Sequence, residues 1–468
     1  MDIFGTSITQ LRELIQNKKV SPNEVWEYFA KRSKKYNKEL NVYITLLDRP
    51  RTDLIVKGII PNLELSGIPL AVKDNFCTKG IRTTASSKVL EEFIPPYEST
   101  VTSKLQKAGY ELLGKTNMDA WAHGSSTETS DFGPTKNPWD TTRAPGGSSG
   151  GTAAAVSAYL TPGGIGSETA GSIRQPAAWC GIVGLKPTYG RVSRYGVIAM
   201  GSTFDCPGPM TTTVEDAALL LQDIAGKDPY DATSAPQQVP NYLTEMKQNK
   251  TYTIGVPREY MEGLESSLQK RIEESFDVLK KMGHKIKSIS LLHPKYDISV
   301  YTILQRAEGS SNLGRYDGVR YGNERAAFGM EAKRRIMLGT YTLSVGYYDA
   351  FYKKAQKVKT LIIQDLMKAF ENIDLIVSSP TPVTALKLGE FKKYPFFGET
   401  MDVLNEAAAV AGTPAISMPC GLDKDGLPVG LQIMGNYFEE GAILDLAYQF
   451  QQETNFFDVI KIGREKYV

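Results

Sequence analysis

The sequence predicts an α/β fold, and three observations support this prediction. Short apolar segments that end in turn residues alternate with segments whose apolar residues have helical spacing. The chain has 468 residues, enough for one large domain or for two or three average ones. Hydrophobic residues make up 41% of it, too large a share for a disordered chain. Alternation of strands and helices favours an α/β sheet.

The N-terminal elements are helical. The first 40 residues predict two helices, and Ser21 can cap the second, with Pro22 at its first position and Glu24 completing a capping box. Five of the eight residues at 31–38 are basic. We attribute these charges to stabilisation of a helix C-terminus by its dipole, with a nucleic-acid site as the alternative.

The sheet is expected to begin with two strands, at 67–75 and 110–117, because both are short, apolar and followed by turn residues. A helix at 101–109 lies between them. A second helix, at 152–160, has the composition of a buried element and directly follows the stretch PGGSSGG at 145–151.

The α/β pattern continues through the second half. A polar, proline-bearing passage at 227–250 is the best linker candidate, but strands and helices resume after it, so no domain boundary is required. We expect a single domain over 1–468, with N-terminal helices within 1–60 and room for a subdomain insertion around 227–345. The helix at 441–453 is expected to close the chain. The other predicted elements are strands at 251–257, 285–291, 373–380, 415–421 and 427–435, and a helix at 265–283.

The charge balance argues against direct binding to nucleic acids or membranes. Lys and Arg number 54 and Asp and Glu 52, which gives a net charge of +2. The N-terminus lacks a basic start with an apolar stretch, and no apolar run reaches about 18 residues. We expect a cytoplasmic protein of bacterial type with reduced thiols, an organellar matrix being the alternative location. The cysteines and histidines are too far apart for a zinc site: Cys77, Cys180, Cys206, Cys420, His123, His284 and His293.

The stretch PGGSSGG admits three interpretations. A flexible linker would continue in polar sequence, whereas this stretch runs into an apolar helix. A phosphate-binding P-loop needs a lysine at fixed spacing after the glycines, and none is there. A rigid turn that lets another backbone segment come close remains. A second small-residue turn, at 166–176, contains Ser172, and its consecutive N–H groups can point toward one atom, as an oxyanion hole requires.

Together with the lysine of AVKDN, these two turns resemble the amidase-signature hydrolases. The resemblance is carried by PGGSSGGTAAAV, GSIRQPAAWCGIVGLKPTYGRVSRYG, GIPLAVKDN, GKTNMDAWAHGSSTE and KNPWD. Similar stretches continue as far as GLPVGLQIMG, so nearly the whole chain is covered. The resemblance implies a central mixed β-sheet with helices on both faces.

The resemblance also implies a Ser-Ser-Lys triad, with Ser172 as nucleophile, Ser148 as bridging hydroxyl and Lys73 as general base. A cis peptide bond is implied at Ser148. The N–H groups expected to form the oxyanion hole are those of Thr169, Ala170 and Gly171.

A lysine can act as the base only if its pKa falls. At the ordinary value of about 10.4, roughly one lysine in 2,500 is neutral at pH 7. Burial can lower the pKa to about 7–8, and Lys73 directly follows the apolar IPLAV. The rival is a Ser-His-Asp triad, but no Gly-x-Ser-x-Gly elbow is present. A surface role suffices for His284, at a predicted helix end, and His293 precedes Pro294 in a loop. Only His123 lies in a stretch with family resemblance.

The resemblance places the α-carboxylate of glutamine against Arg335 and its α-ammonium against Asp402. A guanidinium pairs bidentately with a carboxylate, and a carboxylate is the natural partner of an ammonium. Taken alone, Arg335 could be a solvated arginine of KRRIMLG, and Asp402 an acidic residue in the first turn of a helix.

The implied reaction is hydrolysis of glutamine to glutamate and ammonia through a Ser172 acyl-enzyme. The ammonia would pass to a partner B subunit that uses ATP and Mg²⁺ to amidate Glu-tRNA(Gln), in some organisms Asp-tRNA(Asn). A small C subunit would stabilise the complex. This chain is then expected to need no cofactor and to meet tRNA only through the B subunit. The alternatives are a stand-alone amidase for small or aryl amides with the same triad, and a scaffold with a decayed site, against which the three intact residues argue.

Several features depart from the family pattern. Glu168 stands where aspartate is usual and Ala170 where glycine is usual, and a positive φ at the latter would add strain of about 1 kcal/mol. His123 stands where methionine is common and adds a titratable group near the site. The stretch 322–334 is shorter than is common, so the glutamine pocket is the least constrained prediction.

Overall fold

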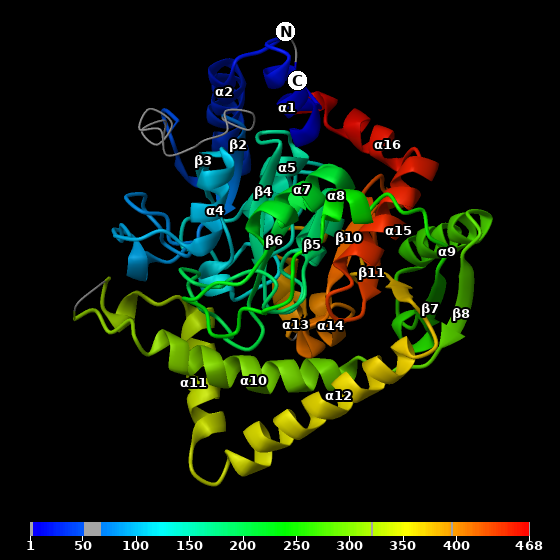
Figure 1. The fold of residues 1–468 in the computed structure, drawn as a ribbon. Helices are drawn as coiled ribbons and strands as arrows, with labels where there is room; N and C mark the ends of the chain where they lie inside the picture. Colours follow the sequence, from blue (N-terminus) through cyan, green and yellow to red (C-terminus); the bar gives the residue numbers. More distant parts are fainter. Residues whose placement is uncertain (1–2, 51–66, 320–321, 395, 468) are drawn as a thin grey trace.

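The computed structural model describes residues 3–50, 67–319, 322–394 and 396–467. In these residues the strands form one 11-stranded sheet at the centre of the molecule (Figure 1). Its order is β1-β3-β2-β4-β6-β5-β10-β11-β9-β7-β8. The strands are β1 (Tyr43–Leu46), β2 (Pro69–Lys73), β3 (Glu111–Thr116), β4 (Gly163–Glu168), β5 (Val183–Lys186), β6 (Cys206–Thr211), β7 (Thr253–Pro257), β8 (Lys285–Ile289), β9 (Leu375–Ser378), β10 (Ala415–Leu422) and β11 (Pro428–Gly435).

The sheet is mixed, as the family resemblance implied. β2 runs parallel to β3 and β4, and β7 runs parallel to β8 and β9, whereas the other neighbouring strands are antiparallel. Because β2 and β4 are parallel neighbours, their C-terminal residues, Lys73 and Glu168, lie at the same edge of the sheet. This edge carries the candidate site.

Helices cover both faces of the sheet. A side chain added at Gly163 of β4 would meet Ile8 and Leu220, whereas one added at Gly164 would meet Thr152, because successive strand residues point to opposite faces. These contacts place α1 and α7 on one face and α5 on the other. The helices of both faces are α1 (Ile8–Gln16), α2 (Pro22–Leu40), α4 (Thr100–Ala108), α5 (Gly150–Ser157), α6 (Arg174–Cys180), α7 (Val214–Ile224), α8 (Tyr242–Glu245), α9 (Ser266–Lys281), α15 (Glu440–Glu453) and α16 (Phe456–Gly463).

A further group of helices crosses one end of the molecule, at the bottom of Figure 1. It contains α10 (Lys295–Leu313), α11 (Met330–Leu343) and α12 (Lys354–Phe370), and the short α13 (Phe397–Asp402) and α14 (Glu406–Ala411). α10 packs against α11 and α12, and α12 packs against α14. Ala355, Ile362 and Leu366 recur at helical spacing on α12 and are buried, which explains why this helix lies along the body.

The seven predicted strands are all found, and the capping box of α2 is confirmed. The Ser21 hydroxyl accepts from the Glu24 N–H at 3.2 Å, and the Glu24 carboxylate accepts from the Ser21 N–H at 2.8 Å. In the basic run at 31–38, Arg32 is buried and donates to the carbonyl oxygens of Ala158 and Tyr159, beyond the C-terminus of α5. A basic side chain thus serves a helix C-terminus, although not that of its own helix.

Three expectations need correction. α15 does not close the chain, because α16 follows it. The helix predicted at 152–160 begins earlier, at Gly150, and ends at Ser157. His284 has no surface role: it is buried where α9 leads into β8, its Nδ1 accepts from the Tyr252 N–H at 3.2 Å, and burial lowers its pKa. Of the predicted N-terminal region 1–60, residues 1–2 and 51–60 lie outside the described residues.

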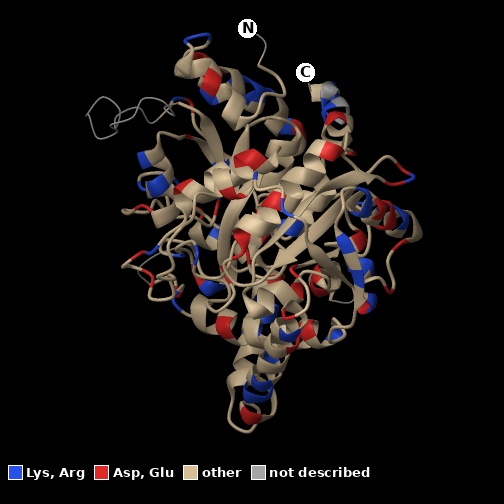
Figure 2. Ribbon diagram, turned by 45° about the vertical axis from the view of Figure 1, so that its right-hand side comes forward, with Lys and Arg blue, Asp and Glu red and all other residues tan. Residues whose placement is uncertain are grey.

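Charged residues of both signs are interspersed in Figure 2, in keeping with the small net charge. Within the described ranges, no helix is both long enough and apolar enough to cross a bilayer. The four cysteines are buried, and none of them forms a disulfide.

Candidate active site

Lys73 ends β2 and is completely buried. Its Nζ donates to the Ser148 hydroxyl at 2.8 Å and to the Ser167 carbonyl oxygen at 2.9 Å. Burial lowers the pKa of Lys73 to about 7, against the opposing effect of Asp119, Asp205 and Glu168. About half of the amine is therefore neutral near pH 7, and a neutral amine can accept a proton from a hydroxyl.

Ser148 lies in the glycine-rich turn before α5, and the peptide bond between Gly147 and Ser148 is cis, as expected. The turn is held by two backbone contacts: the Gly147 N–H donates to the Gln175 side-chain oxygen at 2.8 Å, and the Asp119 N–H donates to the Ser148 carbonyl at 3.2 Å. A side chain at Gly147 would lie 2.0 Å from the Asp119 carboxylate. The interpretation of this stretch as a rigid, closely packed turn is confirmed.

Ser172 lies between β4 and α6, in the second small-residue turn. Its carbonyl oxygen accepts from the Ser149 N–H at 3.2 Å, which places the turn beside Ser148. Among the described residues, the Ser172 hydroxyl has no hydrogen-bond partner, so it is free to meet a substrate. The structure brings Lys73 and Ser148 into direct contact and Ser172 next to them; the role of each residue remains a prediction.

Glu168 explains how the second turn is fixed. Its carboxylate accepts from the N–H groups of Ile173 and Arg174 at 3.1 and 3.2 Å, at the start of α6, and from the Arg174 guanidinium. A carboxylate in this place stabilises a helix N-terminus. Glu168, which stands where the family usually has aspartate, thus holds the start of α6 through these hydrogen bonds.

The proposed oxyanion donors remain free. Within the described part of the chain, the N–H groups of Thr169, Ala170, Gly171 and Ser172 have no hydrogen-bond acceptor. Such a run of free donors in one turn can bind an oxyanion. Ala170 does not have a positive φ, so the strain considered for an alanine here does not arise.

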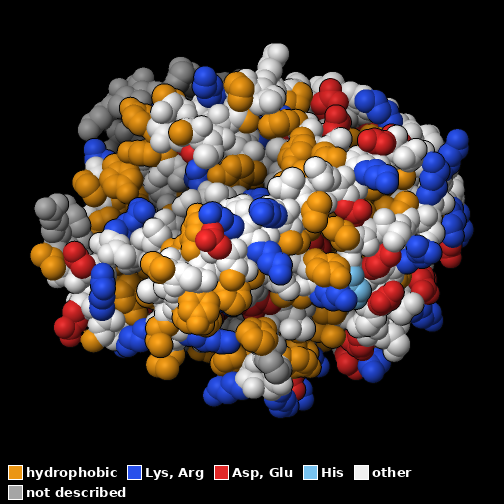
Figure 3. All heavy atoms as spheres, turned by 90° about the horizontal axis from the view of Figure 1, so that it is seen from below, with side chains coloured by type: hydrophobic (Ala, Val, Ile, Leu, Met, Phe, Trp, Pro, Cys, Tyr) orange, Lys and Arg blue, Asp and Glu red, His pale blue; other side chains and the backbone are white. Residues whose placement is uncertain are grey.

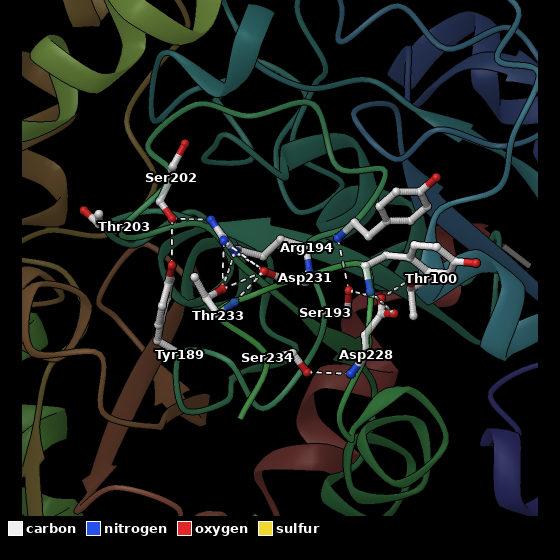
Figure 4. A network of polar contacts seen from close by, with 12 residues as sticks. Thr100, Tyr189, Ser193, Arg194, Ser202, Thr203, Asp228, Asp231, Thr233 and Ser234 are labelled. Carbon is white, nitrogen blue, oxygen red and sulfur yellow. Dashed lines mark hydrogen bonds and ion pairs between the residues drawn. The ribbon is translucent and has the colours of Figure 1, made fainter. Parts of the chain in front are cut away.

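The Thr169 end of this turn is held by a buried carboxylate. The Thr169 hydroxyl donates to Asp205 at 2.8 Å, and Asp205 also accepts from the N–H groups of Met200 and Gly201. Met200, Gly201 and Asp205 belong to the loop that precedes β6. Figure 4 shows the polar network next to this loop: Arg194 pairs with Asp231 at 3.1 Å and also donates to the Ser202 carbonyl oxygen of the loop. The loop that orients Thr169 is thereby anchored to residues about 30 positions further along the chain.

Asp402 lies directly against the second small-residue turn, which carries Ser172 and is called the nucleophile turn after its predicted role. A Cβ added at Gly171 would be 2.2 Å from Asp402 Oδ1, so only glycine leaves room for this carboxylate. Its Oδ2 accepts from the Ser125 hydroxyl at 2.7 Å, whereas Oδ1 is buried and has no partner among the described residues. Burial raises the pKa of Asp402 well above its usual range. A bound cation would favour the ionised carboxylate.

Arg335 is buried rather than solvated. Its Nε donates to Glu331 at 2.7 Å, its Nη1 donates to the Gln305 side-chain oxygen at 2.9 Å, and its Nη2 lies 4.0 Å from Glu399. It lines a pocket of about 700 Å³. Other residues of that wall include His123, Ser125, Arg334, Phe396 and Glu399.

The pocket wall does not include the three triad residues. Ser125 connects the pocket to the turn that carries Ser172, because Ser125 lines the pocket and donates to Asp402, which in turn lies against Gly171. The structure thus brings Asp402 to the nucleophile turn and places Arg335 at the pocket.

Sequence reasoning missed Asp119 and Asp205 as supports of the site. Asp119 is buried and accepts from the N–H groups of Ser126 and Thr127 and from the Thr129 hydroxyl. The signal was the run of hydroxyl residues in GSSTETS, which can bind a shared carboxylate. Nothing in the sequence says which carboxylate they share.

Comparisons with known proteins place the chain among the amidases. The Amidase family model matches residues 24–444. The A subunit of the glutamyl-tRNA(Gln) amidotransferase of Persephonella marina is 49% identical over 97% of this chain and 99% of its own length. The protein of the same name from Coxiella burnetii is 48% identical over 96% of this chain and 98% of its own length.

Solved structures agree. The A subunit of the glutamyl-tRNA(Gln) amidotransferase of Thermotoga maritima superposes with a TM-score of 0.84 at 38% identity and covers 96% of this chain and 94% of its own. The peptide amidase of Stenotrophomonas maltophilia superposes with a TM-score of 0.81 at 28% identity, over 97% of both chains. The chain therefore belongs to the amidase-signature family.

Proposed function

We propose that this chain is the glutamine-hydrolysing subunit of a tRNA-dependent amidotransferase and works in the cytoplasm of a bacterium. The observation that carries the chemistry is the 2.8 Å contact between a buried lysine amine and the Ser148 hydroxyl, beside Ser172. The assignment to the amidotransferase is supported by relatives of that name that are 45–49% identical over nearly the whole chain.

The reaction would proceed through an acyl-enzyme. Neutral Lys73 takes a proton through Ser148, and the Ser172 oxygen attacks the side-chain carbonyl carbon of glutamine. The free N–H groups of the turn at 169–172 stabilise the oxyanion. The proton returns through Ser148 to the leaving nitrogen, the C–N bond breaks and ammonia departs. Water then attacks the ester and releases glutamate.

Asp402 and Arg335 would select glutamine over other amides. The unpartnered Asp402 oxygen next to Gly171 suits the α-ammonium, and Arg335 at the pocket suits the α-carboxylate. The surroundings of Arg335 include two carboxylates, Glu331 and Glu399, which reduce its net attraction for an anion.

The partners would be a B subunit that uses ATP and Mg²⁺, a small C subunit, and a Glu-tRNA(Gln) or Asp-tRNA(Asn) held by the B subunit. Exposed apolar side chains around the turn between α11 and α12 support the proposal that a partner protein binds there. Figure 3 looks onto this end of the molecule and shows hydrophobic side chains among lysines and arginines. Exposed members are Met337, Tyr341, Val345, Tyr347 and Phe351. A cluster of this kind is typical of a surface that another protein covers.

The test is an ammonia-release assay on the chain purified from its host, with and without the proteins that accompany it. We expect glutamine hydrolysis that increases with the partner present. A Tyr347→Ser variant should lose partner binding while its hydrolysis of a simple amide is unchanged. A stand-alone amidase, which the likeness to the peptide amidase makes the second candidate, would ignore glutamine and hydrolyse simple amides without a partner.

A further inference from the structure

His123 is a buried histidine on the wall of the pocket. Its side chain is completely buried, and neither ring nitrogen has a hydrogen-bond partner among the described residues. It shares the wall with Arg335 and Ser125. A buried polar atom without a hydrogen-bond partner lowers the free energy of unfolding by about 1–3 kcal/mol, so an imidazole with two such atoms destabilises the fold. It is suited to a ligand that supplies the missing hydrogen bonds.

The loop that carries His123 is rigid and linked to the triad. The Thr129 hydroxyl donates to Asp119 at 2.9 Å and also contacts the His123 carbonyl oxygen at 3.2 Å. The N–H of the same Asp119 donates to the Ser148 carbonyl. The backbone at His123 is therefore connected to Ser148 through Thr129 and Asp119.

The imidazole is neutral. Burial, together with the nearby guanidinium groups of Arg335 and Arg306, lowers the pKa of His123 well below its usual range. A neutral imidazole offers one N–H donor and one acceptor. It can donate to an anion beside Arg335 without repelling the arginine.

A second free donor lies near His123. Because the Gln305 side-chain oxygen accepts from Arg335, its Nε2 points away from the arginine and is buried without a partner among the described residues. A Cβ added at Gly309 of α10 would lie 3.1 Å from Gln305 Nε2 and 3.9 Å from His123 Nε2. Both unpartnered nitrogens thus lie close to Gly309, where no side chain separates them from α10.

We propose that His123 binds the α-carboxylate of glutamine together with Arg335 and so determines specificity for this substrate. The inference rests on the proposed function. Two of the three guanidinium nitrogens of Arg335 already donate to Glu331 and Gln305, so the carboxylate needs a further donor. A methionine, which the family commonly has in place of His123, cannot donate a hydrogen bond.

The experiment compares two substrates in the purified complex: glutamine and 4-aminobutanamide, which has the same amide and amine but no α-carboxylate. His123→Met should raise KM for glutamine about 10-fold or more, with kcat within about twofold, because a hydrogen bond to a charged group is lost. For 4-aminobutanamide, kcat/KM should change less than about twofold. His123→Gln keeps a donor and should restore KM to within about threefold. His293→Met, at an exposed histidine, is the matched control and should change neither substrate.

An unchanged KM for glutamine in His123→Met would overturn the inference, as would an equal loss with both substrates. Thermal unfolding of each variant separates a folding defect from a binding defect, and His123→Met should unfold at the same or a higher temperature because it removes two unpartnered polar atoms. If the wild-type complex releases no ammonia from glutamine, the proposed function itself fails and this inference falls with it.

Discussion

The nucleophile region and the pocket region of this molecule are built in different ways. The nucleophile region lies where β2 and β4 end, and backbone contacts and glycines too crowded for any side chain hold it. The pocket region is formed by side chains of α11, of the loop around His123 and of the segments 391–394 and 396–399, many of them charged. In the first arrangement, close packing leaves little room for the exchange of a side chain. In the second arrangement, the exchange of a single side chain can change which substrate the pocket accepts.

The largest expected effect comes from a substitution in the nucleophile region. Ser172→Ala removes the attacking oxygen and should reduce ammonia release from glutamine by about 10⁴-fold or more. The KM for any residual turnover should change little, because the pocket is intact. Ammonia is measured in steady state, and unfolding by urea serves as the control. Activity close to wild type would show that another residue is the nucleophile.

A second change tests the protonation of the base. Lys73→Arg keeps a positive charge but cannot lose its proton, so it should be about as inactive as Ser172→Ala. In the wild type, kcat/KM should rise with pH through a midpoint near the pKa of about 7, since only the neutral amine accepts a proton. The pH profile of kcat/KM checks this. A profile that is flat between pH 6 and 8 contradicts a role for Lys73 as the base.

A third change tests the proposed substrate contact between the two regions. Asp402→Asn removes the carboxylate that would pair with the α-ammonium of bound glutamine next to Gly171, and it should raise KM for glutamine about 10- to 100-fold, with a smaller effect on kcat. An equal loss of kcat with unchanged KM would assign Asp402 to the reaction rather than to binding. Steady-state kinetics with glutamine decides between the two.

The smallest effect concerns stability. Burial raises the pKa of Asp205 from 3.8 to about 6. A carboxyl whose pKa is raised on folding contributes stability at low pH, and this contribution is lost as the pH rises through the folded pKa. The two-unit shift corresponds to about 3 kcal/mol. The free energy of unfolding of the wild type relative to Asp205→Asn should therefore fall by up to about this amount between pH 4 and pH 7. A difference that does not depend on pH would contradict the shifted pKa.

The same division explains what could be predicted from the sequence. Regular apolar strands such as those at 69–73 and 428–435 were found, whereas β4, rich in glycine, and β6, which contains two prolines, were missed because they lack the usual strand composition. The contact of Lys73 with Ser148 agrees with the predicted triad, because short motifs fix it. The contacts of Arg335 and His123 depend on long-range packing of α10 and α11, which no local pattern records.

The central claim is that Ser172 forms the acyl-enzyme. The most direct measurement is mass spectrometry of the peptide that contains Ser172, after the complex has been quenched with acid during glutamine turnover. We predict a glutamyl adduct on Ser172 in the wild type and none in Ser172→Ala. A glutamyl adduct on any other residue would contradict the claim.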